Sequence, residues 1–159
     1  MAVRRYASGM TRRGRILIRS MELSDGEFIV ALGRSAFAEY SYEPSAGVLA
    51  MTRRGRTLVA SQDGTPVGFA IVEVTPHEKA HLVAISVAEG VRGRGIAREL
   101  LEGIERMARR AGARSLGLVT ADSNLAALEL FLRCGFERVG RATRYYQRGQ
   151  NAIRMEKKL

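Results

Sequence analysis

The order of apolar and polar positions in the first third of the chain predicts one strand followed by helices. Ile16 and Ile18 alternate with their neighbours as in a short strand. A helix is predicted over residues 24–38, where apolar residues recur at helical spacing and Ser24 and Glu27 have the spacing of a capping box. A second short helix is predicted over residues 46–54.

The middle of the chain predicts a hairpin, a buried strand and a long helix. Apolar, β-branched runs at 57–61 and 66–74 flank the turn sequence Asp63-Gly64-Thr65, which favours an antiparallel hairpin. Residues 81–87 are nearly all apolar, as in a central strand; a short buried helix has the same lack of period, but the flanking residues favour the strand. Apolar positions over 96–111 then follow helical periodicity up to Gly112.

The last third predicts a second buried strand, a helix and a closing strand pair. Residues 115–120 complete a strand–turn–helix–strand unit, whose two strands are normally parallel. Asn124 is placed to cap a helix that ends before Gly135. Residues 136–146 and 151–157 are predicted as strands, with Tyr145 and Tyr146 on alternate faces. The fold class is therefore α/β, a mixed sheet with helices on its faces.

Composition restricts the protein to a narrow set of classes. The chain has 159 residues, of which 46% are hydrophobic and 26% charged, and this favours one globular domain. A single cysteine, Cys134, allows no internal disulfide and fits a reducing compartment, so we expect a cytoplasmic protein. Two histidines without zinc-site spacing predict no metal site, and no apolar run is long enough to span a membrane.

Charge points to an anionic partner. The net charge of +10 favours phosphates, nucleic acid or acidic proteins. Arginines without acidic partners crowd residues 1–14, for which we expect a disordered tail ahead of a domain over 15–159. The alternative is a functional arm that makes weak contact with nucleic acid or the ribosome, which would be salt-sensitive.

The segment 91–97 is the strongest candidate for a binding site. Gly93 and Gly95 remove side chains from the turn between a central strand and the long helix, so backbone N–H groups can converge on one anion. The helix start, Arg92, Arg94 and Arg98 add to the positive field. Neither a dinucleotide fingerprint nor a Walker loop fits these residues. A glycine-rich turn with solvated arginines is the alternative.

Two motifs together resemble the GNAT superfamily of N-acetyltransferases. Arg92, Gly95 and Ala97 fit its acyl-CoA loop, Arg/Gln-x-x-Gly-x-Gly/Ala. Its second signature, Asn-x-x-Ala-x-x-Leu-Tyr-x-x-x-Gly-Phe, is met by Asn124, Ala127, Leu130, Gly135 and Phe136, whereas Phe131 replaces the tyrosine. The segment from Tyr145 to Met155 also resembles ribosomal-protein-alanine and archaeal N-terminal acetyltransferases.

The resemblance implies a mostly antiparallel sheet with a splayed central parallel strand pair, which binds acetyl-CoA as co-substrate. The thioester would lie near residues 84–87, where a backbone N–H can stabilise the oxyanion while the amine attacks directly. Cys134 is then a packing residue and no nucleophile is needed. The residues implied to contact the cofactor are Ile85, Ser86, Val87, Arg92, Gly93, Arg94, Gly95, Ile96, Ala97, Asn124, Ala127 and Phe131.

Both proton carriers usual in related enzymes are replaced. Val119 stands where close N-terminal acetyltransferases have Glu or His, and Phe131 lacks the hydroxyl of the usual acid. We expect Glu73 or His81 as the base, directly or through water, and Tyr145 or Tyr146 as the acid. Loss of a base is least harmful for an α-amine, whose pKa of about 8 lies well below that of lysine, about 10.4.

These observations predict transfer of an acetyl group from acetyl-CoA to a primary amine, with a protein or peptide α-amine favoured. The alternatives are an acetyltransferase for lysine or small-molecule amines, and a non-catalytic sensor that only binds acyl-CoA, as Val119 and Phe131 would allow. The sequence leaves the oligomeric state open, with a homodimer as one option.

Overall fold

A computed structural model describes residues 5–6, 10–11, 14–40 and 56–159 and shows one extended sheet. The strands follow the order β1-β3-β4-β5-β6-β7-β9-β8, and β2 pairs with β3. Only β6 and β7 run parallel; all other neighbours are antiparallel. The strands are β1 (Arg5–Tyr6), β2 (Met10–Thr11), β3 (Gly14–Ser20), β4 (Arg56–Gln62), β5 (Thr65–Thr75), β6 (Lys79–Val87), β7 (Ser115–Ala121), β8 (Glu137–Ala142) and β9 (Ala152–Lys158).

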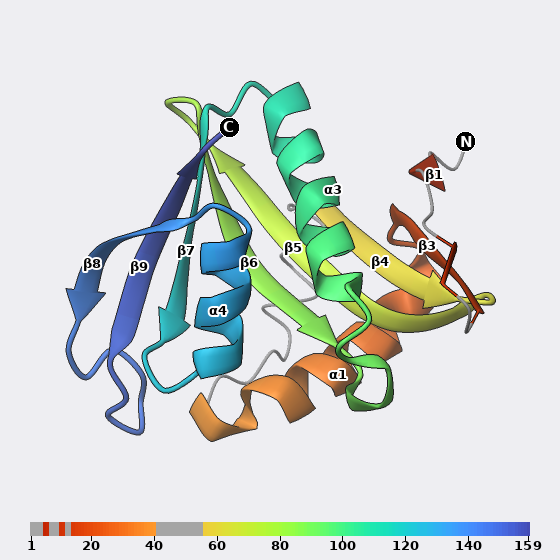
Figure 1. The fold of residues 1–159 in the computed structure, drawn as a ribbon, viewed down its shortest axis with the longest axis horizontal. Helices are drawn as coiled ribbons and strands as arrows, with labels where there is room; N and C mark the ends of the chain where they lie inside the picture. Colours follow the sequence, from red (N-terminus) through yellow and green to blue (C-terminus); the bar gives the residue numbers. More distant parts are fainter. Residues whose placement is uncertain (1–4, 7–9, 12–13, 41–55) are drawn as a thin grey trace.

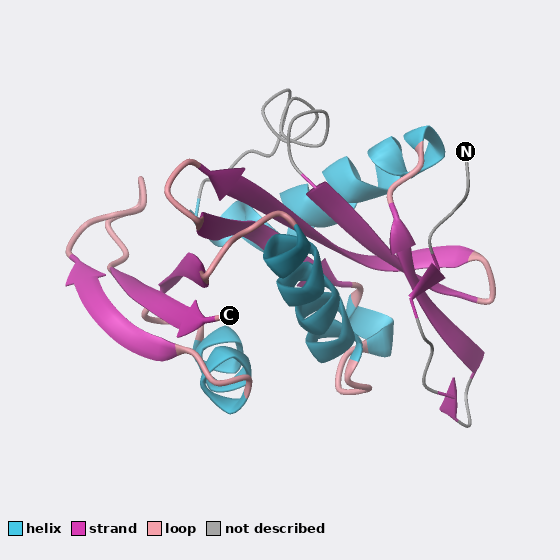
Figure 2. Cartoon of the chain, turned by 90° about the horizontal axis from the view of Figure 1, so that it is seen from above, coloured by secondary structure: helices cyan, strands magenta, loops and turns pink. Residues whose placement is uncertain are grey.

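Helices cover both faces of the sheet, as predicted (Figure 2). On one face, α3 (Ile96–Arg110) and α4 (Leu125–Arg133) pack on the larger core, in which Leu100, Leu101 and Ile104 are fully buried. On the other face, α1 (Gly26–Phe37) buries Ile29 against Phe69 and Ile71 of β5. The single-turn 3-10 helices are η1 (Leu23–Asp25), η2 (Ala38–Tyr40) and η3 (Glu89–Val91).

Most predicted elements are confirmed. The β4–β5 hairpin turns at Asp63 and Gly64, which both have positive φ angles, 49° and 88°. The predicted long helix is α3, which reaches the turn at Gly112. Asn124 caps α4 as expected, because its Oδ1 accepts a hydrogen bond from the Ala127 N–H at 3.2 Å. Local patterns with their own start and stop signals therefore predicted these elements correctly.

Two local predictions are wrong. Ser24 and Glu27 do not form the capping box; instead the Asp25 carboxylate accepts a hydrogen bond from the Glu22 N–H at 2.8 Å and pairs with Arg19. The strand predicted over 136–146 ends at Ala142. Tyr145 and Tyr146 therefore lie in the β8–β9 loop, residues 143–151, and not on opposite faces of a strand.

Two predictions concern regions that the structure describes in part or not at all. Within the predicted tail 1–14, β1 and β2 pair antiparallel with β3. The division into a tail and a domain from residue 15 stays a prediction. The helix predicted over 46–54 lies outside the described residues.

The parallel pair β6–β7 separates along its length (Figure 1). The two strands pair only at Lys79–Ser115, Ala80–Leu116 and His81–Gly117, at one end of each. After Leu82, which still pairs with Val72, the register of β6 with β5 shifts so that Val83 is an extra, bulged residue. Since a bulge bends its strand, it accounts for the divergence of β6 from β7 at this point.

Candidate active site

The end of β6 presents backbone groups toward the gap between the separating strands. The Ala88 N–H bonds to the Val67 carbonyl of β5 at 2.8 Å. Backbone groups alternate in direction along a strand, so those of Ser86 and Ala84 also face β5, whereas those of Ile85 and Val87 face β7. Strand β7 pairs with none of these residues. The gap can therefore accept an extended, amide-containing chain as an additional strand-like partner.

The loop after β6 combines glycines with the start of α3. Gly93 and Gly95 have φ angles of 73° and 81°, and a Cβ at either position would meet no atom within 4 Å. Gly95 is the N-cap of α3 and provides no side-chain cap, so the first N–H groups of the helix stay available. Open space beside uncapped N–H groups is the environment that phosphate prefers.

The loop arginines are tied to the loop itself. Arg92 Nε donates to the Val87 carbonyl at 3.0 Å, and Arg94 Nη2 donates to the Gly90 carbonyl at 3.2 Å. Arg98, in the first turn of α3, pairs with Glu102 at 3.0 Å. Arg92 stays exposed, so its remaining N–H groups can still meet an anion. Its bond to Val87 joins the predicted phosphate loop to the end of β6.

The predicted contacts on α4 lie at the other side of the gap. Asn124 lies at the pocket, although its side-chain oxygen is used for capping α4, and Ala127 is half-buried. Phe131 is 3% exposed and its ring lies 5.6 Å from that of Phe136, so it is a core residue. Burial raises the pKa of Cys134, which lowers its thiolate fraction and fits the expected packing role.

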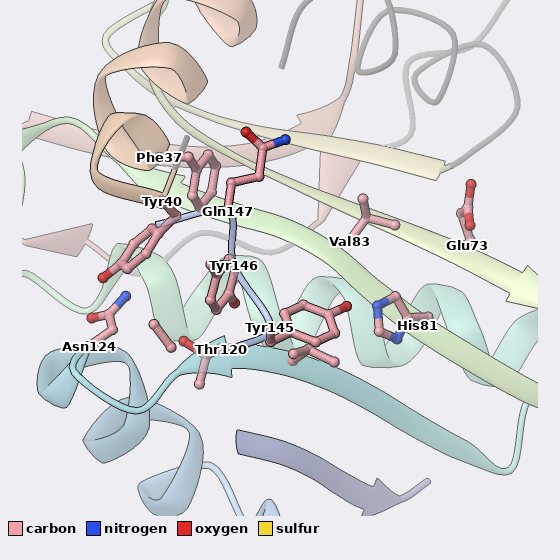
Figure 3. Close-up of a pocket in the computed structure, with 12 residues that line it drawn as sticks. Phe37, Tyr40, Glu73, His81, Val83, Thr120, Asn124, Tyr145, Tyr146 and Gln147 are labelled. Atoms are coloured by element: carbon pink, nitrogen blue, oxygen red, sulfur yellow. The ribbon is translucent and has the colours of Figure 1, made fainter. Parts of the chain in front are cut away.

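A pocket of about 500 Å³ opens on the α1 face of the sheet, beside the point where β6 and β7 separate (Figure 3). It brings together all four predicted proton carriers: Glu73 of β5, His81 of β6, and Tyr145 and Tyr146 of the β8–β9 loop. Figure 3 shows Glu73 and His81 at one end and Tyr40 and Asn124 at the other. The other lining residues are Phe37, Val83, Val119, Thr120, Ala121 and Gln147.

Glu73 and His81 form a cross-strand pair. They are directly opposite each other in the β5–β6 register, and His81 is the last β6 residue that pairs with β7. Burial lowers the pKa of His81, although the nearby Glu73 charge acts in the opposite direction. The imidazole is therefore neutral at neutral pH and able to accept a proton.

The two loop tyrosines differ in environment. Tyr146 is half-buried between Tyr145 and Tyr40, each at a ring-centroid distance of 5.1 Å. Burial, with smaller contributions from these two phenols, raises the pKa of Tyr146 to about 12. Tyr145 is 51% exposed, and its hydroxyl is turned toward the His81 ring in Figure 3. The pocket thus holds one strongly retained phenol proton and one solvent-facing phenol.

Several pocket residues carry no signal in the sequence. Phe37 and Tyr40 line the pocket, but the sequence does not single them out as site residues. Thr120 and Gln147 were not predicted at all. Phe37, Tyr40 and Gln147 reach the pocket because the end of α1 and the β8–β9 loop meet there, which no local pattern encodes. One signal was available for this part of β7. Val119 stands before Asn124, where related enzymes have Glu or His, and this position indicates that Thr120 and Ala121 beside it also border the site.

A comparison with family models decides the family. The model described as "Acetyltransferase (GNAT) family" matches residues 20–136. The chain belongs to this family. GNAT proteins are acetyltransferases, and the general reaction of the family moves an acetyl group from acetyl-CoA to an amine. The predicted fold class, one mostly antiparallel sheet with a parallel central pair, is confirmed.

Relatives of known function match part of this GNAT chain. Streptothricin acetyltransferase from Streptomyces lavendulae is 35% identical over 106 residues, which cover 63% of this chain and 56% of the relative. N-alpha-acetyltransferase MAK3 from Arabidopsis thaliana is 31% identical over 101 residues, 62% of this chain and 53% of the relative. The chain thus spans about half the length of the relatives that it matches.

Solved structures agree over most of the fold. A ribosomal-protein-alanine N-acetyltransferase from Brucella melitensis is 25% identical with a TM-score of 0.78, covering 90% of this chain and 99% of that one. The structure of yncA from Salmonella typhimurium with its cofactor acetyl-CoA is 18% identical with a TM-score of 0.80, over 91% of this chain and 94% of that one. Among the described residues, no helix is long and apolar enough to cross a membrane, and no group of acidic, histidine or cysteine side chains could hold a metal ion.

Proposed function

We propose that this GNAT protein transfers the acetyl group of acetyl-CoA to the α-amine of a protein or peptide by direct attack. The observation that carries the proposal is a pocket beside the β6–β7 separation, where Glu73, His81, Tyr145 and Tyr146 meet. The backbone groups of Ile85 and Val87, the glycine loop and the start of α3 supply the surroundings that acetyl-CoA needs. A relative named as an N-alpha-acetyltransferase supports the α-amine.

His81 is the base in this proposal, and the negative charge of Glu73 assists it. The neutral imidazole takes a proton from the amine, directly or through one water, while the nitrogen bonds to the acetyl carbon and the carbon–sulfur bond breaks. Glu73, opposite His81 in the sheet, stabilises the imidazolium that results. A second proton must then reach the leaving thiolate.

Tyr145 is the better placed of the two phenols to supply that second proton. A phenol with a pKa of about 12, as for Tyr146, would lose its proton to a thiolate of ordinary pKa, about 8.5, at a cost of roughly 5 kcal/mol. Tyr145 lacks that burial and its hydroxyl turns toward His81. Tyr146 then serves as a wall of the acceptor pocket.

The missing Glu or His at Val119 favours an α-amine over a lysine. At neutral pH about a tenth of α-amines are already neutral, against about one lysine in a few thousand. The corresponding free-energy difference is about 3.4 kcal/mol, at 1.36 kcal/mol for each pKa unit. A pocket that relies on one partly buried histidine is therefore better suited to an acceptor that needs little deprotonation.

The test is transfer of labelled acetyl from acetyl-CoA to matched peptides. One peptide has a free α-amine and no lysine, and its partner has a blocked α-amine and one lysine. We expect label on the first peptide and much slower label on the second. Label found only on the lysine peptide would mean that the acceptor is a lysine and not an α-amine. Tight binding of acetyl-CoA without turnover on any amine would favour the sensor, for which Val119 in the pocket is the motivating observation.

A further inference from the structure

The acceptor pocket is held together by one long-range side-chain hydrogen bond. Gln150 of the β8–β9 loop donates from Nε2 to the Glu39 carbonyl of η2 at 2.9 Å, across 111 residues of sequence. A carbonyl oxygen can accept only from the NH₂ end of an amide, and this fixes the orientation of the Gln150 side chain. The bond joins the two segments that supply Tyr40, Tyr145 and Tyr146 to the pocket.

The same residue also holds the loop that carries these tyrosines. The Gln150 carbonyl accepts a hydrogen bond from the Tyr146 N–H at 3.1 Å, and the Tyr146 carbonyl accepts one from the Gly149 N–H at 2.8 Å. Tyr146 is thus fixed through its backbone by Gln150, and through its ring by Tyr40, which directly follows Glu39. Gln150 links both sides of this aromatic contact.

The carbonyl end of the Gln150 side-chain amide does not stabilise the fold. Its Oε1 is buried and has no hydrogen-bond partner among the described residues. A buried acceptor without a partner is destabilising, and a methionine of similar length would fill the same space without that penalty. The amide therefore fits a role in holding the η2 turn in place better than a role in stability.

We propose that Gln150 is a positioning residue, which sets the acceptor pocket by fixing the β8–β9 loop to η2 and so the rings of Tyr40, Tyr145 and Tyr146. This inference rests on the proposed function for its kinetic consequence. Gly93 and Gly95 follow the C-terminal end of β6 and do not line the pocket, so we expect the loss of Gln150 to affect the acceptor and to spare acetyl-CoA.

The variant that tests this is Gln150→Met, with Gln62→Met at the end of β4 as the matched control. Gln62 lies in the β4–β5 hairpin, away from the pocket. We expect the acceptor KM of Gln150→Met to rise about tenfold while the acetyl-CoA KM stays within twofold, since small misplacements of binding groups are costly. Gln62→Met leaves both values unchanged.

A spectroscopic readout separates this inference from the proposed function. The chain has no tryptophan and five tyrosines, of which three form the pocket cluster, so near-UV circular dichroism reports on their packing. We expect Gln150→Met to lose much of this signal with an unchanged far-UV spectrum and thermal midpoint. If the signal falls but wild-type protein acetylates no amine, the positioning role stands and the proposed function fails. An unchanged tyrosine signal, or an unchanged acceptor KM in an active enzyme, overturns the positioning role.

Discussion

The proposed acetyl-CoA side and the proposed acceptor side of this site are built in different ways. The acetyl-CoA side consists of backbone: the gap-facing groups of Ile85 and Val87, two glycines with positive φ, and the uncapped start of α3. These parts follow one another within residues 85–97. The acceptor side consists of side chains from β5, β6, β7, the end of α1 and the β8–β9 loop.

This difference predicts which part of the site tolerates a change of side chains. Backbone groups keep their chemistry whatever the neighbouring side chains are, provided that the glycines allow the turn. The acceptor side changes with each substitution, and Val119, which lines the pocket where the resemblance implies Glu or His, still pairs regularly with β9. Experiments that act on one side and leave the other unaffected test this division.

The largest effect is expected from His81→Ala on the acceptor side. Loss of the general base should lower kcat about a hundredfold, with acetyl-CoA affinity unchanged. The matched control is His77→Ala, since His77 is the other histidine of the chain and is exposed in the β5–β6 turn. Steady-state kinetics with both substrates measure kcat and the acetyl-CoA KM of each variant. Equal losses in the two variants would remove His81 from the mechanism.

A smaller effect is expected from Gly95→Ala, which should weaken the binding of acetyl-CoA and not that of the acceptor. Both Gly95 and Gly64 have positive φ, 81° and 88°, and a Cβ at either meets no atom within 4 Å. Each substitution should therefore cost a similar 1–2 kcal/mol of unfolding free energy, roughly, through backbone strain alone. Calorimetry should then show acetyl-CoA binding weakened about tenfold in Gly95→Ala only. Similar affinities in the two variants would contradict the role of the loop.

A local effect on stability is expected from Asn124→Ala. The substitution removes the hydrogen bond to the Ala127 N–H and should cost about 1 kcal/mol of unfolding free energy. Ser123→Ala is the control, because Ser123 is exposed and its side chain makes no capping bond to α4. Chemical denaturation measures both. A destabilisation of the same size in Ser123→Ala would argue against the cap.

The smallest effect concerns pH. Because burial lowers the pKa of His81 in the folded state, the unfolded chain binds its proton at a higher pH, near 6.5. Stability should therefore fall as pH drops below about 6.5 and be unaffected by this group above it. His81→Ala should flatten that dependence. Urea midpoints are measured at about pH 5 and about pH 8 for the wild-type protein and for His81→Ala. The same change of midpoint with pH in both proteins would contradict the lowered pKa of His81.

The fold was largely predictable because its signals are local. The α3 periodicity, the Asp63-Gly64 turn and the Asn124 cap each depend on residues within a few positions of one another. The capping box at Ser24 failed for a tertiary reason. Arg19, on β3, binds Asp25 through two hydrogen bonds, at 2.6 and 2.9 Å, and draws that carboxylate into the cap of η1 instead.

The acceptor side was predictable only as a set of chemical candidates. The sequence singles out Glu73, His81, Tyr145 and Tyr146 but assigns the tyrosines to a strand. The strand ends early because Arg144 adopts a positive φ, 50°, and its N–H bonds to Asn151 Oδ1. Asn151 is in turn held by Asp122 after β7. Such contacts between distant segments are invisible to a local pattern.

Amide hydrogen exchange with and without acetyl-CoA tests most directly whether the backbone of residues 85–97 holds the co-substrate. The two states are compared at saturating acetyl-CoA, with free acetate as the control. We predict new protection at the amides of Ile85 and Val87 and at the first turn of α3, with little change in the β8–β9 loop. Protection confined to the β8–β9 loop, or none at saturation, would contradict binding between β6 and β7.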